Sequence, residues 1–80
     1  MIPISALKPG QKGIIQEFPE DEVPIKLLEI GCLPGNTVEL VQIAPLNDPL
    51  YINVDGCHVA IRRAIASQIL ISLAEDPKDL

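Results

Sequence analysis

The chain has few aromatic residues and few cations. It contains one Phe, one Tyr and no Trp among 80 residues, and six Lys and Arg stand against eleven Asp and Glu, for a net charge of −5. Proteins that bind nucleic acid neutralise its phosphates with cations, and single-strand binders stack the bases on aromatic rings. Both shortages argue against a nucleic-acid partner.

Long apolar runs are also missing. No uncharged stretch approaches the roughly 18 apolar residues that a membrane span requires, so the sequence predicts no insertion into a bilayer. The first residues, MIPI, have no positive region followed by an apolar run and do not resemble a secretory signal. We therefore expect a cytoplasmic protein in which both cysteines, Cys32 and Cys57, are reduced thiols.

Aliphatic residues, in contrast, are abundant. Ile, Leu and Val make up 27 of the 80 residues, a composition that excludes intrinsic disorder. A chain of this length forms one domain and hides only about 60% of its unfolded surface, so its core must be dense. We expect residues 1–80 to form a single domain with its core at about 7–73. The charged segment 75–80 is expected to be a frayed tail.

Strand patterns dominate the rest of the chain. They predict β-strands at 13–18, 37–43, 50–54, 57–61 and 69–73. Only Asp55-Gly56 separates the third strand from the fourth, and this dipeptide is typical of a type I′ hairpin turn. Within 37–43 the apolar positions change face after Leu40, which indicates a β-bulge or a bend. The expected fold is mainly β: a small SH3-like barrel of about five strands.

One short helix is expected after the first strand. Asp21 is a suitable N-cap, Pro24 falls in the first turn, and Gly31 stands where helices commonly end. A helix of about two turns cannot stand alone, so its apolar stripe must pack on the sheet. That stripe consists of Ile25, Leu27, Leu28 and Ile30. A single further helical turn is expected within 62–67.

The residues offer little for catalysis. The two glycines of 31–35 are not followed by Lys-Ser/Thr, so this segment is not a phosphate-binding loop. Cys57 and His58 are neighbours in a predicted strand and therefore point to opposite faces, which prevents a Cys–His nucleophile pair. We expect a protein that is not an enzyme, with no catalytic residue and no cofactor-binding residue.

Metal binding rests on three candidates, namely Cys32, Cys57 and His58, which are suitable ligands for Fe²⁺ or another divalent transition metal. No C-x-x-C or H-x-x-x-H pair is present, however. The simpler interpretation places Cys57 in the core, Cys32 after the helix cap and His58 in solvent. We therefore expect no resident metal and keep direct metal binding as an alternative.

Two exposed features are candidates for contact with a partner. Arg62-Arg63 is the only basic pair, and it is either an arginine finger for GTP hydrolysis or an edge-strand charge that discourages aggregation. The proline-bounded loop 44–49 and the strand after it contain the candidate exposed contact residues Leu46, Leu50 and Tyr51.

Four segments together resemble the FeoA family. The run KLLEIGCLPG at 26–35 is similar to the family's helix-to-turn signature, and APLNDP at 44–49, the Asp55-Gly56 turn and VAIRR at 59–63 follow in the family's order. The segment 64–71 is similar to the family's ending, so the resemblance extends from about residue 7 to residue 73. One departure is Cys32, where the family usually has Leu or Met; this fits a packing role.

The resemblance implies a cytoplasmic SH3-like domain that accompanies FeoB, a membrane ferrous-iron transporter with a cytosolic GTPase domain. It implies an accessory protein that binds the cytosolic part of FeoB and supports Fe²⁺ uptake. Modulation of the FeoB GTPase through Arg62 or Arg63 is the alternative, beside direct metal binding. Homo-oligomerisation through an exposed strand edge also stays open. The expected partner-binding residues are Leu33, Pro34, Leu46, Asn47, Asp48 and Arg63.

Overall fold

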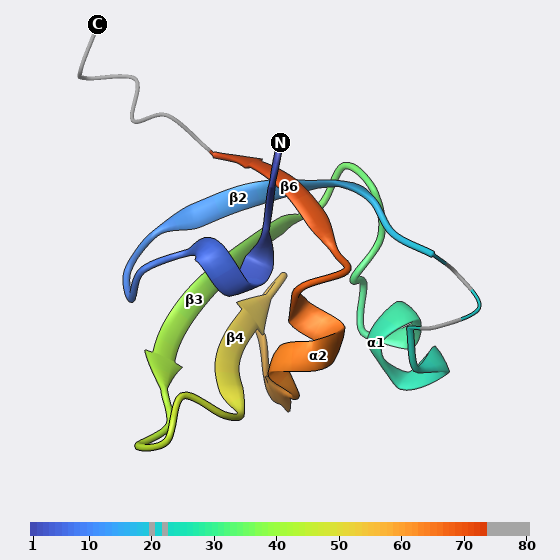
Figure 1. The fold of residues 1–80 in the computed structure, drawn as a ribbon. Helices are drawn as coiled ribbons and strands as arrows, with labels where there is room; N and C mark the ends of the chain where they lie inside the picture. Colours follow the sequence, from blue (N-terminus) through green and yellow to red (C-terminus); the bar gives the residue numbers. More distant parts are fainter. Residues whose placement is uncertain (20, 22, 74–80) are drawn as a thin grey trace, which may run out of the picture.

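A single curved antiparallel sheet forms most of the molecule (Figure 1). The computed structural model describes residues 1–19, 21 and 23–73. Within them the sheet has six strands in the order β1-β6-β2-β3-β4-β5, so β1 and β5 are its edges. The strands are β1 (Ile2–Pro3), β2 (Lys12–Glu17), β3 (Thr37–Ile43), β4 (Leu50–Val54), β5 (Cys57–Ile61) and β6 (Leu70–Leu73). The predicted mainly β fold is confirmed.

The N-terminal residues add a strand that the sequence did not indicate. Ile2 pairs with Ile71 and Pro3 with Leu70. A two-residue strand is too short to show any alternation, so only its pairing with β6 reveals it. A 3-10 turn, η1 (Ile4–Ala6), follows and buries Ile4 completely. Ile4 is thus part of the buried core, and the expected tail, 75–80, lies outside the described residues.

The two local β signals are confirmed. Strand register shifts between Leu40 and Gln42 on the β3–β4 ladder, where the change of apolar face indicated a bulge. Asp55 and Gly56 have φ angles of 52° and 89°, and a type I′ turn requires positive φ at both positions. A second register shift in β2, opposite β6, had no counterpart in the sequence analysis.

The helix after β2 is shorter than predicted. α1 (Ile25–Glu29) has Pro24 as its N-cap, without a side-chain cap, so Asp21 does not begin it. Leu27 is buried, but Ile25 is 70% exposed, because a five-residue helix buries only a narrow stripe. Gly31 ends the helical segment at a φ of 104°, as expected. The predicted turn near the C-terminus is α2 (Arg63–Ala66).

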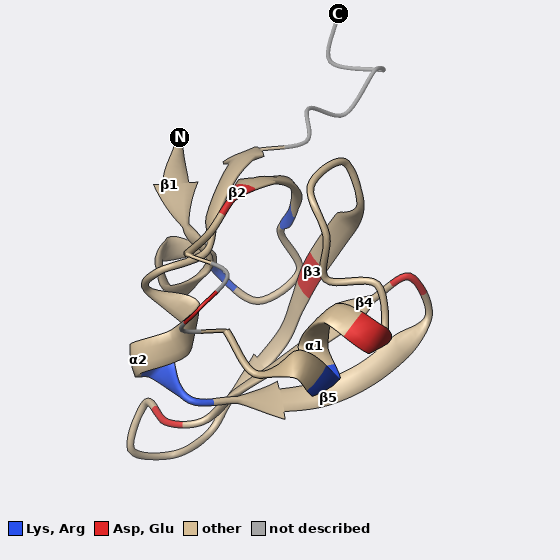
Figure 2. Ribbon diagram, turned by 90° about the vertical axis from the view of Figure 1, so that its right-hand side faces the viewer, with Lys and Arg blue, Asp and Glu red and all other residues tan. Residues whose placement is uncertain are grey.

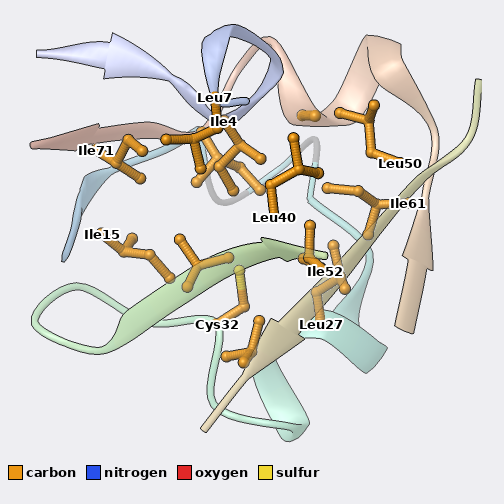
Figure 3. Packing of buried hydrophobic residues seen from close by; sticks show 14 of the residues in the cluster. Ile4, Leu7, Ile15, Leu27, Cys32, Leu40, Leu50, Ile52, Ile61 and Ile71 are labelled. Carbon is orange, nitrogen blue, oxygen red and sulfur yellow. The ribbon is translucent and has the colours of Figure 1, made fainter. Parts of the chain in front are cut away.

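Aliphatic side chains from the strands, η1 and α1 fill the space that the sheet encloses (Figure 3). The fully buried members include Ile4, Ile15, Leu40, Leu50, Ile52, Ile69, Ile71, Val38, Val54 and Cys32. No buried polar or charged side chain is found in the described part of the chain. The surface therefore carries the functional groups.

Neither α1 nor α2 comes near the length of a membrane-spanning helix, and no other helix in residues 1–19, 21 and 23–73 does so.

Candidate partner-binding site

The loop between β3 and β4, residues 44–49, projects a leucine into solvent. Leu46 is 93% exposed. The loop closes on itself, because the Asn47 N–H donates to the Ala44 carbonyl at 2.8 Å and the Ala44 N–H donates to the Pro49 carbonyl at 3.1 Å. The Asp48–Pro49 peptide bond is cis. We call residues 44–49 the β3–β4 loop.

Arg63 attaches this loop to the rest of the protein. Its backbone N–H donates to Asp48 Oδ1 at 2.9 Å, and its Nε donates to the Asn47 carbonyl at 2.7 Å. Its Nη1 also donates to the Ser5 carbonyl of η1 at 3.3 Å. In Figure 2 the basic start of α2 lies beside the acidic segment of the loop. Arg63 is therefore half-buried and used within the molecule, while its neighbour Arg62 is exposed.

A second surface lies beside α1. A shallow hollow of about 230 Å³ is lined by Gln16, Glu17, Phe18, Leu28, Leu33 and Pro34. The exposed Leu33 and Pro34 belong to the turn that the sequence analysis selected. The sequence analysis did not select the end of β2 or Phe18 as part of this surface. The one signal that could have indicated Phe18 is that the chain's single Phe directly precedes a proline. We call these six residues the α1 groove.

The structure does not bring the two surfaces together. Figure 1 shows the β3–β4 loop at the lower left and α1 at the lower right, and Figure 2 separates them again after the turn of 90°. Leu33 and Pro34 thus belong to one candidate surface. Leu46, Asn47, Asp48 and Arg63 belong to the other.

The candidate metal ligands Cys32, Cys57 and His58 do not form a common site in the described residues. Cys32 points into the core (Figure 3), and burial raises its pKa to about 11 by removing water from the thiolate. The prediction that Cys57 lies in the core is wrong: it is exposed at the start of the edge strand β5, as is His58. Across residues 1–19, 21 and 23–73, no three His, Cys, Asp or Glu side chains are grouped so that they could hold a metal ion.

Leu50 corrects a further expectation. It is fully buried rather than an exposed contact residue, because its side chain faces the core from β4, where it pairs with the buried Ile61. Tyr51, the next residue, points to the other face and is 40% exposed.

These features define a small antiparallel β-barrel of the SH3-like class. The FeoA of Stenotrophomonas maltophilia, a prokaryotic SH3 domain protein solved in complex with zinc, matches this fold with a TM-score of 0.75 at 21% identity, over 90% of this chain and 91% of its own. The chain belongs to the FeoA domain family, whose model matches residues 2–73.

Individual relatives agree with this assignment. The chain is 40% identical over 71 residues to an Fe(2+) transport protein A/Fe(2+) transporter FeoB fusion protein of Porphyromonas gingivalis; it spans 8% of that relative's length, and the match covers 88% of this chain. The FeoA protein of Chlorobium tepidum has a TM-score of 0.85 at 27% identity, over 92% of this chain and 71% of its own. Iron(II) transport protein A of Clostridium thermocellum has a TM-score of 0.80 at 30% identity, over 91% of this chain and 46% of its own.

Proposed function

We propose that this protein is a cytoplasmic accessory component of ferrous iron transport that binds the cytosolic part of a FeoB-type transporter. The observation that carries the proposal is the 40% identical relative in which a transport protein A segment and the transporter FeoB share one polypeptide. A covalent link keeps two domains at a high effective concentration. A separate chain reaches the same proximity only by binding.

The surface of the domain suits this role. Among the residues that the structure describes, those that are buried are all apolar, and exposed apolar side chains lie on the β3–β4 loop and in the α1 groove. Leu46 and Leu33 are therefore available to a partner. Such binding alters the transporter only if the domain contacts two of its states with different affinity. If those two states are the GDP-bound and GTP-bound forms, the affinity will depend on the nucleotide bound to the transporter.

Retention of the protein by an immobilised FeoB-type transporter tests the proposal. We expect the wild-type chain to be retained, and the double variant Leu33→Glu/Leu46→Glu to be lost, because it places a charge on both candidate surfaces. Val41→Glu is the matched control: Val41 is 42% exposed, close to the 43% of Leu33, and belongs to neither surface. No retention of the wild-type chain with GDP, with a GTP analogue or without nucleotide would refute the proposal.

Modulation of the transporter's GTPase is the second candidate, and the exposed Arg62 supports it. Arg63 is engaged in hydrogen bonds with Asn47, Asp48 and Ser5, whereas Arg62 is exposed. Arg62 is therefore the candidate arginine finger. GTP turnover by the transporter with and without this protein measures the effect. If Arg62→Ala retains binding but loses a stimulation that the wild type gives, the domain acts on the GTPase.

A further inference from the structure

We infer that the β3–β4 loop is a preformed anchor: Arg63 holds the loop in shape so that Leu46 inserts into an apolar pocket on the FeoB-type partner. This inference rests on the proposed function. To that function it adds Leu46 as the contact residue, an apolar pocket as the matching feature of the partner, and Arg63 as the residue that positions Leu46.

Leu46 is the most exposed large apolar residue in the described part of the chain. Its exposure of 93% exceeds that of Met1 at 71% and of Ile25 at 70%. A single exposed leucine is ordinary on a protein surface. Leu46 differs because residues on both sides of it form hydrogen bonds that hold the loop in one conformation. Its side chain therefore projects from an ordered backbone.

On the C-terminal side of Leu46, the next two residues accept hydrogen bonds from Arg63. The Asn47 carbonyl accepts the hydrogen bond of Arg63 Nε, and the Asp48 carboxylate accepts the Arg63 N–H. That N–H lies in the first turn of α2, where backbone donors have no partner inside the helix, so the Asp48 bond satisfies the helix end as well. On the other side of Leu46, the Ala44 carbonyl accepts the Asn47 N–H.

Arg63 links three segments that are distant in the sequence. The guanidinium is planar and its donors have a fixed geometry, so Nε and Nη1 together set the distance between the Asn47 carbonyl and the Ser5 carbonyl. A Lys at this position keeps the charge but has no such fork. The loop is therefore braced against both α2 and η1.

A braced loop changes the energetics of binding. Association costs conformational entropy when a contact segment must first become ordered, and a rigid segment avoids most of that cost. Residues that dominate an interface are usually side chains that fill a desolvated pocket on the partner. A single protruding leucine on a fixed base fits an apolar pocket, and it does not fit a flat or charged surface.

Affinity measurements against a purified FeoB-type transporter test the inference. We expect Leu46→Ala to weaken binding about 30-fold, the threshold of a dominant interface residue. The thermal unfolding midpoint should stay at the wild-type value, because Leu46 is almost fully exposed. Val41→Ala, which truncates an exposed residue outside both candidate surfaces, is the control and should bind like the wild type. Equal binding by Leu46→Ala would overturn the inference.

A double-mutant cycle separates positioning by Arg63 from a general effect on folding. We expect Arg63→Ala to weaken binding about 5-fold to 10-fold and to accelerate hydrogen exchange at the Asn47 amide. In the Leu46→Ala background the same substitution should change the affinity less than 2-fold, because no anchor is left to position. Arg63→Lys should resemble Arg63→Ala. An undiminished Arg63 effect in the Leu46→Ala background would overturn the positioning role.

The same measurements distinguish a failure of the proposed function from a failure of the Leu46 anchor alone. If the wild-type chain does not bind the transporter, the proposed function fails and the inference fails with it. If the wild type binds and Leu46→Ala binds equally well, the inference alone fails. The contact would then lie elsewhere, and Leu33→Ala would show whether the α1 groove supplies it.

Discussion

Gly13 is the position where one added methyl group should test the packing of the barrel. It is buried in β2, between Val38 of β3 and Leu73 of β6. A Cβ built there would overlap the Ile71 Cδ1 atom, and it would lie 3.2 Å from Ile71 Cβ and 3.1 Å from the Ser72 carbonyl oxygen. The side-chain atom can rotate away, but the backbone oxygen belongs to a paired strand and cannot.

The expected cost of Gly13→Ala is that of an overpacked core, about 1–3 kcal/mol in the free energy of unfolding. For a domain of this size each kcal/mol lowers the unfolding midpoint by about 4–8 °C. Ile71→Val removes Cδ1, the atom nearest to the added methyl, and alone should cost about 0.5–1.5 kcal/mol. The double variant should therefore be more stable than the sum of the single effects predicts, by about 0.5 kcal/mol or more.

Urea unfolding of the four proteins, followed by far-ultraviolet circular dichroism, measures this cycle. After subtraction of the cost of Ile71→Val alone, the residual destabilisation reports the contacts with the Ser72 carbonyl oxygen and Ile71 Cβ, which Ile71→Val does not relieve. A Gly13→Ala protein as stable as the wild type would contradict the packing described here. Strict additivity of the two substitutions would show that Ile71 is not the neighbour that matters.

Three further predictions concern the turn and the thiols. Gly56→Ala should lower the free energy of unfolding in urea by about 1–2 kcal/mol through its φ of 89° alone, because a Cβ added there meets nothing within 4 Å beyond its chain neighbours. Ile71→Val should not relieve this cost. Cys57 should react with an aromatic disulfide reagent at pH 8 in the native protein, and Cys32 only after unfolding; two fast native thiols would contradict the burial of Cys32. Burial raises the Cys32 pKa from 9.0 to about 11, so the unfolded state loses its proton first and stability falls as the pH rises from 9 to 11. Cys32→Ala should lack this part of the decline in urea unfolding, and an identical decline would refute the assignment.

Local signals predicted the arrangement of the elements along the chain well. The bulge in β3 and the Asp55-Gly56 turn were both evident, because a change of apolar face and a two-residue turn are properties of neighbouring residues. The short helix was placed in the correct segment, yet neither its start nor the exposure of Ile25 was predicted. Both depend on how α1 sits against the barrel rather than on its own periodicity.

Burial at the strand ends could not be predicted from alternation. Cys57 and Leu50 have equally strong strand patterns, but Cys57 begins the edge strand β5 and is exposed, while Leu50 begins the inner strand β4 and is fully buried. Alternation specifies which residues share a face; it does not specify whether that part of the face is covered. The missing information is the position of the strand in the sheet.

The candidate site, too, combines features that the sequence predicts with features that only the tertiary structure shows. The sequence by itself determined a mainly β domain with a net negative charge, because composition and strand patterns suffice for that conclusion. Its resemblance to the FeoA family then selected the loop and the turn that carry Leu46 and Leu33. Only the tertiary structure decided that Arg63 braces the β3–β4 loop, and that this loop and the α1 groove lie on separate parts of the molecule. The physical reason is distance along the chain: Arg63 bonds to groups 15, 16 and 58 residues away, and no local pattern records such a contact.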